Sequence, residues 1–113
     1  MQYRNPTMSL TVDNWPMGGS RRGQAHFAIE THPTRGQRGI RSTVDPRTGR
    51  PSKPKTLTYA RHVRIVEGDD GRTYFLEDTG THLSIMQSNM QYQQETIFPG
   101  DARYTALRQM VEA

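Results

Sequence analysis

The chain has 113 residues and contains no cysteine. This absence excludes a disulfide framework, a thiol nucleophile and every zinc site built on thiolate ligands. Strongly apolar residues are also scarce, because leucine, isoleucine, valine and phenylalanine together occupy only eighteen positions. A chain with less than about a fifth of such residues is near the limit at which a core can be buried. A large enzyme core is therefore not expected.

Long apolar runs are missing as well, since nowhere do five strongly apolar residues follow one another. A membrane-spanning helix needs about 20 apolar residues, and a secretory signal needs an apolar run behind a basic start. We therefore expect a cytoplasmic protein without a membrane partner. The sequence also lacks the nucleophile-elbow and metalloprotease motifs and any spaced carboxylate cluster. We expect a protein that is not an enzyme, with no catalytic residue, no metal and no cofactor.

The net charge of +4 conceals an uneven distribution along the chain. Residues 21–64 contain eleven bases and two acids, whereas residues 65–113 contain three bases and eight acids. Arginine outnumbers lysine thirteen to two, and its planar guanidinium suits bidentate contact with phosphate. We predict that the bases of the central segment bind the phosphates of a nucleic acid. These candidate residues are Arg21, Arg22, Arg35, Arg38, Arg41, Arg47, Arg50, Lys53, Lys55, Arg61 and Arg64.

The alternation of apolar and polar residues predicts an antiparallel meander of four to six strands within one domain, residues 1–113. Short strands are expected over 7–12 and 24–31, with a break over 14–19 between them. A hairpin is expected from 57–67 and 72–78, because Asp70-Gly71 supplies the positive φ of a tight turn. Further strands are expected over 81–87 and 90–98.

The hairpin pattern predicts one buried face and a set of cross-strand pairs. A four-residue turn over 68–71 would place Glu67 opposite Arg72, His62 opposite Glu77 and Arg61 opposite Asp78. It would also gather five residues on one face, namely Tyr59, Val63, Ile65, Tyr74 and Leu76.

A C-terminal helix is predicted after Pro99-Gly100, which makes the fold class α+β. Asp101 is the expected N-cap, and Tyr104, Leu107, Met110 and Val111 form an apolar stripe at helical spacing. A helix of this length must pack against the sheet to be stable.

Residues 33–55 are predicted to form a long basic loop, or a mobile arm that becomes ordered on a partner. They contain four prolines, three glycines, seven bases and one acid, and their only aliphatic side chains are Ile40 and Val44. So little apolar surface does not offset an ordering entropy of about 1–2 kcal/mol per residue.

The ten residues from Pro46 to Lys55 resemble an AT-hook, the short motif built on Arg-Gly-Arg-Pro that enters the DNA minor groove. Gly49-Arg50-Pro51 matches its core, and Thr48 separates this core from Arg47. The resemblance implies contact with DNA. The same residues also suit a turn, since proline fixes φ and glycine adopts positive φ.

The leading hypothesis is thus a non-catalytic protein that binds DNA or RNA through an arginine-rich arm. One alternative is an interaction module, inhibitor or adaptor, as mobile elements encode, that docks on an acidic partner and could form homo-oligomers. A second alternative is a binder of a small nucleotide. In this alternative Gly18-Gly19 would form a phosphate cradle with Arg21 and Arg22.

Overall fold

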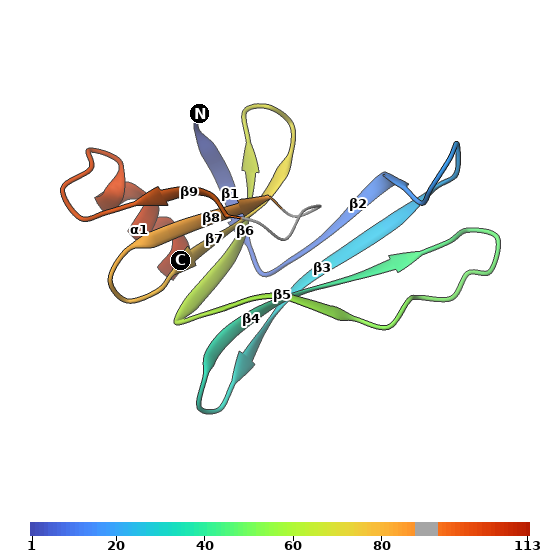
Figure 1. Cartoon of the computed structure of the whole chain (residues 1–113), viewed down its shortest axis with the longest axis horizontal. Coiled ribbons are helices and arrows are strands. Elements are labelled where there is room, and N and C mark those ends of the chain that lie inside the picture. The colour runs from blue at the N-terminus through green and yellow to red at the C-terminus, as the bar shows by residue number, and fades with distance from the viewer. Residues whose placement is uncertain (88–92) are drawn as a thin grey trace.

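A computed structural model describes residues 1–87 and 93–113, and over these residues it contains nine strands and one helix. The strands form two antiparallel sheets, a five-stranded sheet of order β1-β6-β7-β8-β9 and a four-stranded sheet of order β2-β3-β4-β5. In Figure 1 the five-stranded sheet lies at the left, and the four-stranded sheet extends to the right. The predicted α+β class, with antiparallel strands and one C-terminal helix, is confirmed.

The five-stranded sheet comes mainly from the second half of the chain. Its strands are β1 (Tyr3–Thr7), β6 (His62–Gly68), β7 (Thr73–Asp78), β8 (Leu83–Gln87) and β9 (Gln93–Ile97). The strands expected over 72–78 and 81–87 correspond to β7 and β8. The strand expected over 90–98 corresponds to β9, and its residues 90–92 lie outside the described part.

The four-stranded sheet is built from the first half of the chain. Its strands are β2 (Ser9–Pro16), β3 (Arg22–His32), β4 (Gly36–Val44) and β5 (Lys55–Ala60). The strands expected over 7–12 and 24–31 correspond to β2 and β3. The break expected over 14–19 is partly wrong, because β2 continues to Pro16 through a β-bulge between Val12 and Trp15.

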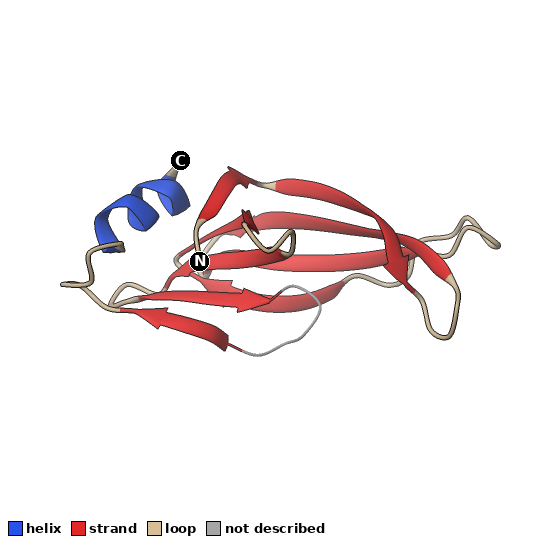
Figure 2. Cartoon of the chain, turned by 90° about the horizontal axis from the view of Figure 1, so that it is seen from above, coloured by secondary structure: helices blue, strands red, loops and turns tan. Residues whose placement is uncertain are grey.

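Helix α1 (Tyr104–Glu112) covers the face of the five-stranded sheet that points away from the other sheet (Figure 2). The predicted stripe is confirmed: Leu107 and Val111 are buried, and Tyr104 and Met110 pack against the same cluster. The predicted N-cap is wrong, because Arg103 occupies that position without a side-chain cap. Asp101 instead accepts a hydrogen bond from the Arg103 amide, at 2.9 Å, in the turn before the helix.

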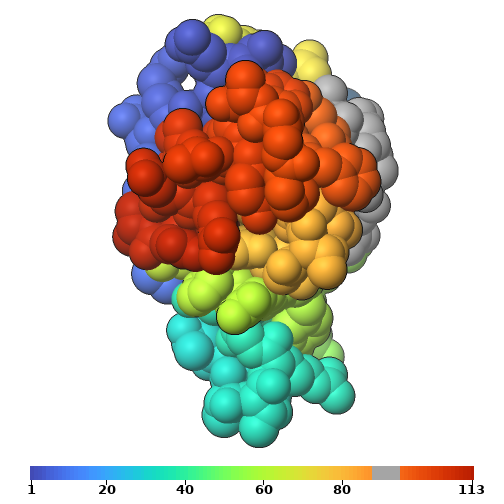
Figure 3. All heavy atoms as spheres, turned by 90° about the vertical axis from the view of Figure 1, so that its left-hand side faces the viewer, coloured from blue at the N-terminus to red at the C-terminus, as the bar shows by residue number. Residues whose placement is uncertain are grey.

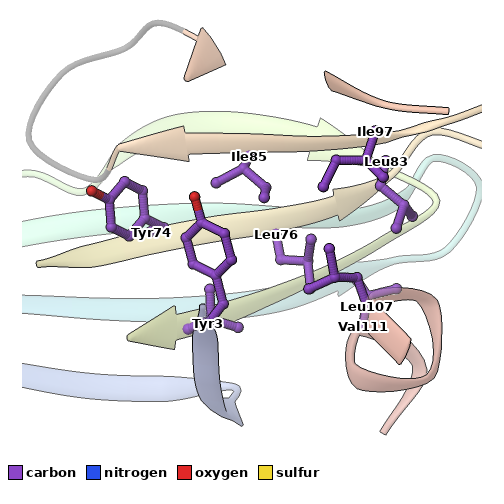
Figure 4. Packing of buried hydrophobic residues seen from close by; sticks show 9 residues of the cluster. Tyr3, Tyr74, Leu76, Leu83, Ile85, Ile97, Leu107 and Val111 are labelled. Atoms are coloured by element: carbon purple, nitrogen blue, oxygen red, sulfur yellow. The ribbon is translucent and has the colours of Figure 1, made fainter. Parts of the chain in front are cut away.

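The first core cluster lies between α1 and the five-stranded sheet (Figure 4). Leu76 and Ile85 come from neighbouring strands and share this cluster with the helix residues Leu107 and Val111, and Tyr74 lies at the far side of it from the helix. Tyr3 of β1 closes this cluster, with its ring edge-on to that of Tyr74 at a centroid distance of 5.3 Å. Packing on the sheet supplies the stability that a nine-residue helix lacks alone.

The second core cluster lies on the opposite face of the same sheet, where the two sheets pack together. Phe27 of β3 meets Phe75 of β7 edge-on, at a centroid distance of 5.9 Å, and both rings are buried. Trp15 adds a third ring, 5.6 Å from Phe27. Val63 and Ile65 of β6 complete the cluster from the five-stranded side. The central strands β6 and β7 are therefore buried on both faces.

Burial on both faces explains why the predicted hairpin register is wrong. Glu67 pairs with Thr73, so five residues separate the strands and every predicted partner is displaced by one position. Because side chains alternate between the two faces of a sheet, a register shift of one residue places residues that were predicted to share one face on opposite faces. Val63 and Ile65 contact the other sheet, whereas Tyr74 and Leu76 face α1. None of the three predicted charge pairs lies in register.

The expected single strand over 57–67 is also wrong, because the chain changes sheets at Arg61. Residues before Arg61 belong to β5 and residues after it belong to β6. Tyr59, predicted to lie in the core, is therefore on β5 and 44% exposed.

The prediction that 33–55 forms one loop or arm is wrong for its first part. Gly36–Val44 is strand β4, which pairs with β3 on one side and β5 on the other. A strand in this position needs few apolar side chains, since backbone hydrogen bonds and the aromatic residues of β3 and β7 hold it. Residues 45–54 remain a loop.

Candidate nucleic-acid interface

Two connections meet at one end of the four-stranded sheet. They are the β2–β3 turn, residues 17–21, and the β4–β5 loop, residues 45–54, at the right of Figure 1. The Arg21 guanidinium forms an ion pair with the Asp45 carboxylate and so joins the turn to the loop. We call this end, with its two connections and the flanking Arg22 and Lys55, the basic tip.

The β4–β5 loop has the turn geometry that its sequence predicts. The Asp45 carbonyl accepts hydrogen bonds from the amides of Thr48 and Gly49, at 3.1 and 2.9 Å, and Gly49 has a φ of 67°. Beyond the turn, the Ser52 amide donates to the Thr43 carbonyl, at 2.7 Å. The segment that resembles an AT-hook is thus a closed loop, and the side chain of Arg50 is exposed beside the turn.

Six of the predicted residues are exposed at the basic tip, which has two acids, Asp13 and Asp45, beside them. The six are Arg21, Arg22, Arg47, Arg50, Lys53 and Lys55. The Arg47 amide and the cations of Arg21 and Arg47 hold the pKa of Asp45 below its usual value. Asp45 thus fixes two of the bases as a structural counter-ion.

The β2–β3 turn is open to solvent. Gly18 and Gly19 have φ values of 105° and 58°, and a Cβ on either would meet no atom within 4 Å. The amide of Arg21 donates to the Gly18 carbonyl at 3.1 Å, which closes the turn. Exposed backbone and two adjacent arginines make the turn accessible to a phosphate group.

Two further predicted residues, Arg35 and Arg61, are exposed near the opposite end of β3. The β3–β4 hairpin that carries Arg35 projects from the body of the molecule, as the teal atoms at the bottom of Figure 3 show. Along an extended strand, the eleven residues from Arg22 to His32 span about 33 Å. The predicted bases therefore fall into separate groups.

Arg38 and Arg41 have neighbours within the four-stranded sheet. Arg38 forms a 2.7 Å ion pair with Glu30, and hydrogen bonds to Tyr59 and Glu30 raise its pKa. Arg41 lies over the Trp15 ring, 5.5 Å from its centroid, and burial lowers its pKa.

Arg64 is only 8% exposed and serves the packing of the fold. Its Nε donates to the Ala113 carbonyl at 2.9 Å, and one terminal nitrogen donates to Gln37 Oε1 at 2.8 Å and the Val63 carbonyl at 2.7 Å. It links helix α1 to β4 and β6, and a guanidinium held in this way does not reach an external phosphate.

One feature of the tip is absent from the sequence-based prediction. A cavity of about 490 Å³ opens between β2, β3 and the start of the β4–β5 loop. It is lined by Asp13, Asn14, Arg22, Gly23, Gln24, Val44 and Pro46. Asn14 lies in the β2 bulge with a φ of 57°, a conformation uncommon outside glycine. The Asp13-Asn14 pair inside an alternating strand pattern was the available signal for a bulge.

The described residues include no group of three or more histidine or acidic side chains that could hold a metal ion. Among the same residues, no helix has the length and apolar character that crossing a membrane requires.

The fold and the site together define a small two-sheet α+β protein with cations gathered at one end of the smaller sheet. Comparisons with protein-family models, with curated proteins and with solved structures found no match to this chain.

Proposed function

We propose that the protein binds nucleic acid through the basic tip, without catalysing a reaction on it. The observation that carries this proposal is the meeting of two connections, 17–21 and 45–54, that are separate in sequence. Each contributes exposed bases, and six cations at one end of a sheet provide a positive potential that attracts phosphates. Arginine supplies four of these six cations and suits bidentate phosphate contacts.

The distribution of acidic residues supports the same assignment. Asp69 and Asp70 lie in the β6–β7 loop, Glu95 lies on β9, and Asp101 lies in the turn before α1, so all four belong to the half of the molecule that contains the five-stranded sheet. Arg103 is paired with Glu95 at 2.6 Å and Asp101 at 3.2 Å, so this half also neutralises one of its own bases. A polyanion is therefore attracted to the tip and repelled from the opposite half of the molecule.

The number of cations sets the expected salt dependence. If all six cations contact phosphates, including Arg21 and Arg47 that pair with Asp45 in the free protein, the slope of log K against log salt reaches its limit of about −5 on a duplex and about −4 on a single strand. Between 50 and 200 mM salt, contacts of this number weaken binding by a factor of about 10³.

The test is fluorescence anisotropy with labelled oligonucleotides over this salt range. The variant carries Arg50→Gln, Lys53→Gln and Lys55→Gln, which are exposed and have no ion pair among the described residues. It should lose about half of the slope, because three of six cations are removed.

The matched control carries Arg4→Gln, Arg72→Gln and Arg108→Gln. These are exposed residues of the five-stranded half and of α1, so the net charge changes equally. The control should bind as the native protein does. An absence of binding at 50 mM salt would overturn the proposal and favour an acidic protein partner, and an equal loss in both variants would show that only net charge matters.

A further inference from the structure

The cavity at the basic tip has a composition that phosphate binding alone does not explain. Asp13 lines it and forms no ion pair among the described residues, although Arg22 lines the same cavity. A carboxylate within a cluster of cations repels phosphates and weakens any purely electrostatic contact. The Asp13 carboxylate is suited to a different role, which is to accept hydrogen bonds from a ligand.

Hydrogen bonding holds Asp13 in position with acceptor capacity remaining. Gln24 Nε2 donates to Asp13 Oδ1 at 2.7 Å, which uses one of about four lone-pair sites of the carboxylate. The β2 bulge, with Asn14 at positive φ, turns Asp13 and Asn14 toward the cavity that both line. Bulges of this kind commonly redirect side chains at binding sites.

The other walls suit a flat, partly apolar ligand. Val44 and Pro46 supply apolar surface, and Arg22 supplies a cation at the rim. The volume of about 490 Å³ is within the range of small-molecule pockets. A nucleobase has an apolar face for such walls and an edge of polar groups for the carboxylate.

Among the bases, guanine presents two adjacent N–H donors, N1–H and the N2 amino group, on its Watson–Crick edge. A carboxylate accepts both at once, whereas adenine offers a ring acceptor at N1 that an ionised carboxylate repels. In a duplex this edge is occupied by base pairing, so only an unpaired guanine reaches Asp13.

Resting on the proposed function, we infer that the cavity binds one unpaired guanine, with Asp13 accepting from its Watson–Crick edge and Arg22 contacting the adjacent phosphate. The ligand is a guanine nucleotide, either within a single strand or free. Val44 and Pro46 contact the face of the base.

The experiment compares single-stranded oligothymidylates that carry one central dG, dI or dA. The dG strand should bind about tenfold more tightly than the dA strand, in line with one bidentate base contact. Inosine keeps N1–H but lacks the amino group, so the dI strand should bind with intermediate affinity. Binding of GMP in the same assay distinguishes a free nucleotide from a guanine that needs the flanking phosphates.

The variant Asp13→Asn tests the assigned acceptor. It should abolish the preference for dG while leaving the salt dependence on the all-thymidine strand unchanged, since no cation is removed. The control Asp69→Asn makes the same charge change in the exposed β6–β7 loop and should keep the preference. Equal circular dichroism spectra confirm that both variants are folded.

Two results with single strands would overturn this inference and leave the proposed function intact. One is equal affinity for the dG and dA strands, and the other is a dG preference that survives Asp13→Asn. If no strand binds at low salt, the proposed function itself fails. Tighter binding to a duplex than to the dG strand would also refute an unpaired guanine, and it would favour the minor-groove contact that the AT-hook resemblance implies.

Discussion

The contact between Gly39 of β4 and Phe75 of β7 offers a sharp test of how the two sheets pack. Gly39 lies within the four-stranded sheet, paired with Ile29 and Thr58, and a Cβ placed on it would lie 2.7 Å from Phe75 Cε1. Real Cβ atoms do not approach ring carbons this closely. Phe75 is fully buried, with Phe27 against it, so a displacement of its ring disturbs the packing between the two sheets.

The variant Gly39→Ala therefore brings two opposing effects into competition. In an ordinary strand the replacement stabilises by about 0.5–1 kcal/mol, because glycine loses more backbone entropy on folding. Overpacking a close-packed interface costs about 1–3 kcal/mol. We expect overpacking to dominate, with a net loss of about 1–2 kcal/mol. For 113 residues this lowers Tm by about 4–8 °C.

The assay is thermal unfolding of a double-mutant cycle with Phe75→Leu. Removing the ring should relieve the clash, so Gly39→Ala becomes neutral or slightly stabilising in the Phe75→Leu background. A rise of Tm when Gly39→Ala is made in the native protein would refute the reasoning. Strict additivity of the two substitutions would refute it equally, because the glycine and the ring would then not be in contact.

Three further predictions concern buried polar groups. Replacing Arg64 with Met removes its hydrogen bonds to the Ala113 and Val63 carbonyls and to Gln37, and should destabilise by about 2 kcal/mol in urea unfolding; unchanged stability would contradict this role. Burial raises the pKa of Glu77, and its Oε1 has no hydrogen-bond partner among the described residues. Above the ordinary pKa of a glutamate, the unfolded chain has released the Glu77 proton while the folded protein still holds it. The free energy of unfolding therefore falls as pH rises from that ordinary pKa to the raised pKa of the folded state. Glu77→Gln should raise Tm at pH 7 by a few degrees, about 1 kcal/mol, and its advantage should vanish near pH 4; a constant difference in Tm would argue against ionisation as the cause. Burial and the hydrogen bond to Asp70 raise the pKa of Tyr74 to about 12. The variant Asp70→Asn should lower the pKa of Tyr74, measured by ultraviolet absorbance. An unchanged pKa would show that Asp70 does not contact the Tyr74 hydroxyl.

Local signals were sufficient to locate several elements. The Asp70-Gly71 pair predicted the turn between β6 and β7, where Gly71 has a φ of 78°. The spacing of Leu107 and Val111 predicted the buried side of α1. Each of these signals depends on residues close together in sequence.

The register of β6 and β7 depends on long-range contacts instead. Ile65-Val66 and Tyr74-Phe75-Leu76 are continuous apolar runs because one sheet face contacts α1 and the other contacts the second sheet. Alternation carries no information about register in such strands.

The candidate interface shows the same limit. The sequence places eleven bases between residues 21 and 64, but their separation follows from the pairing of β4 with β3 on one side and β5 on the other. In the sequence, Arg64 and Arg50 are both arginines of the basic segment 21–64, and nothing there separates a buried one from an exposed one. Only the folded structure shows that Arg64 lies at the junction of α1, β4 and β6.

The four-stranded sheet extends beyond the five-stranded one, and neither core cluster includes a described residue of turn 17–21 or loop 45–54. Substitutions of the exposed Arg47, Arg50 and Lys53 side chains therefore change the surface of the basic tip with little effect on the free energy of unfolding. The glycines at positive φ in the two connections are the exception, because other residues are strained there. Loop 45–54 can accept insertions or exchanged sequences while the fold persists. Evolution or engineering can thus alter the charge and shape of the basic tip largely independently of the stability of the fold.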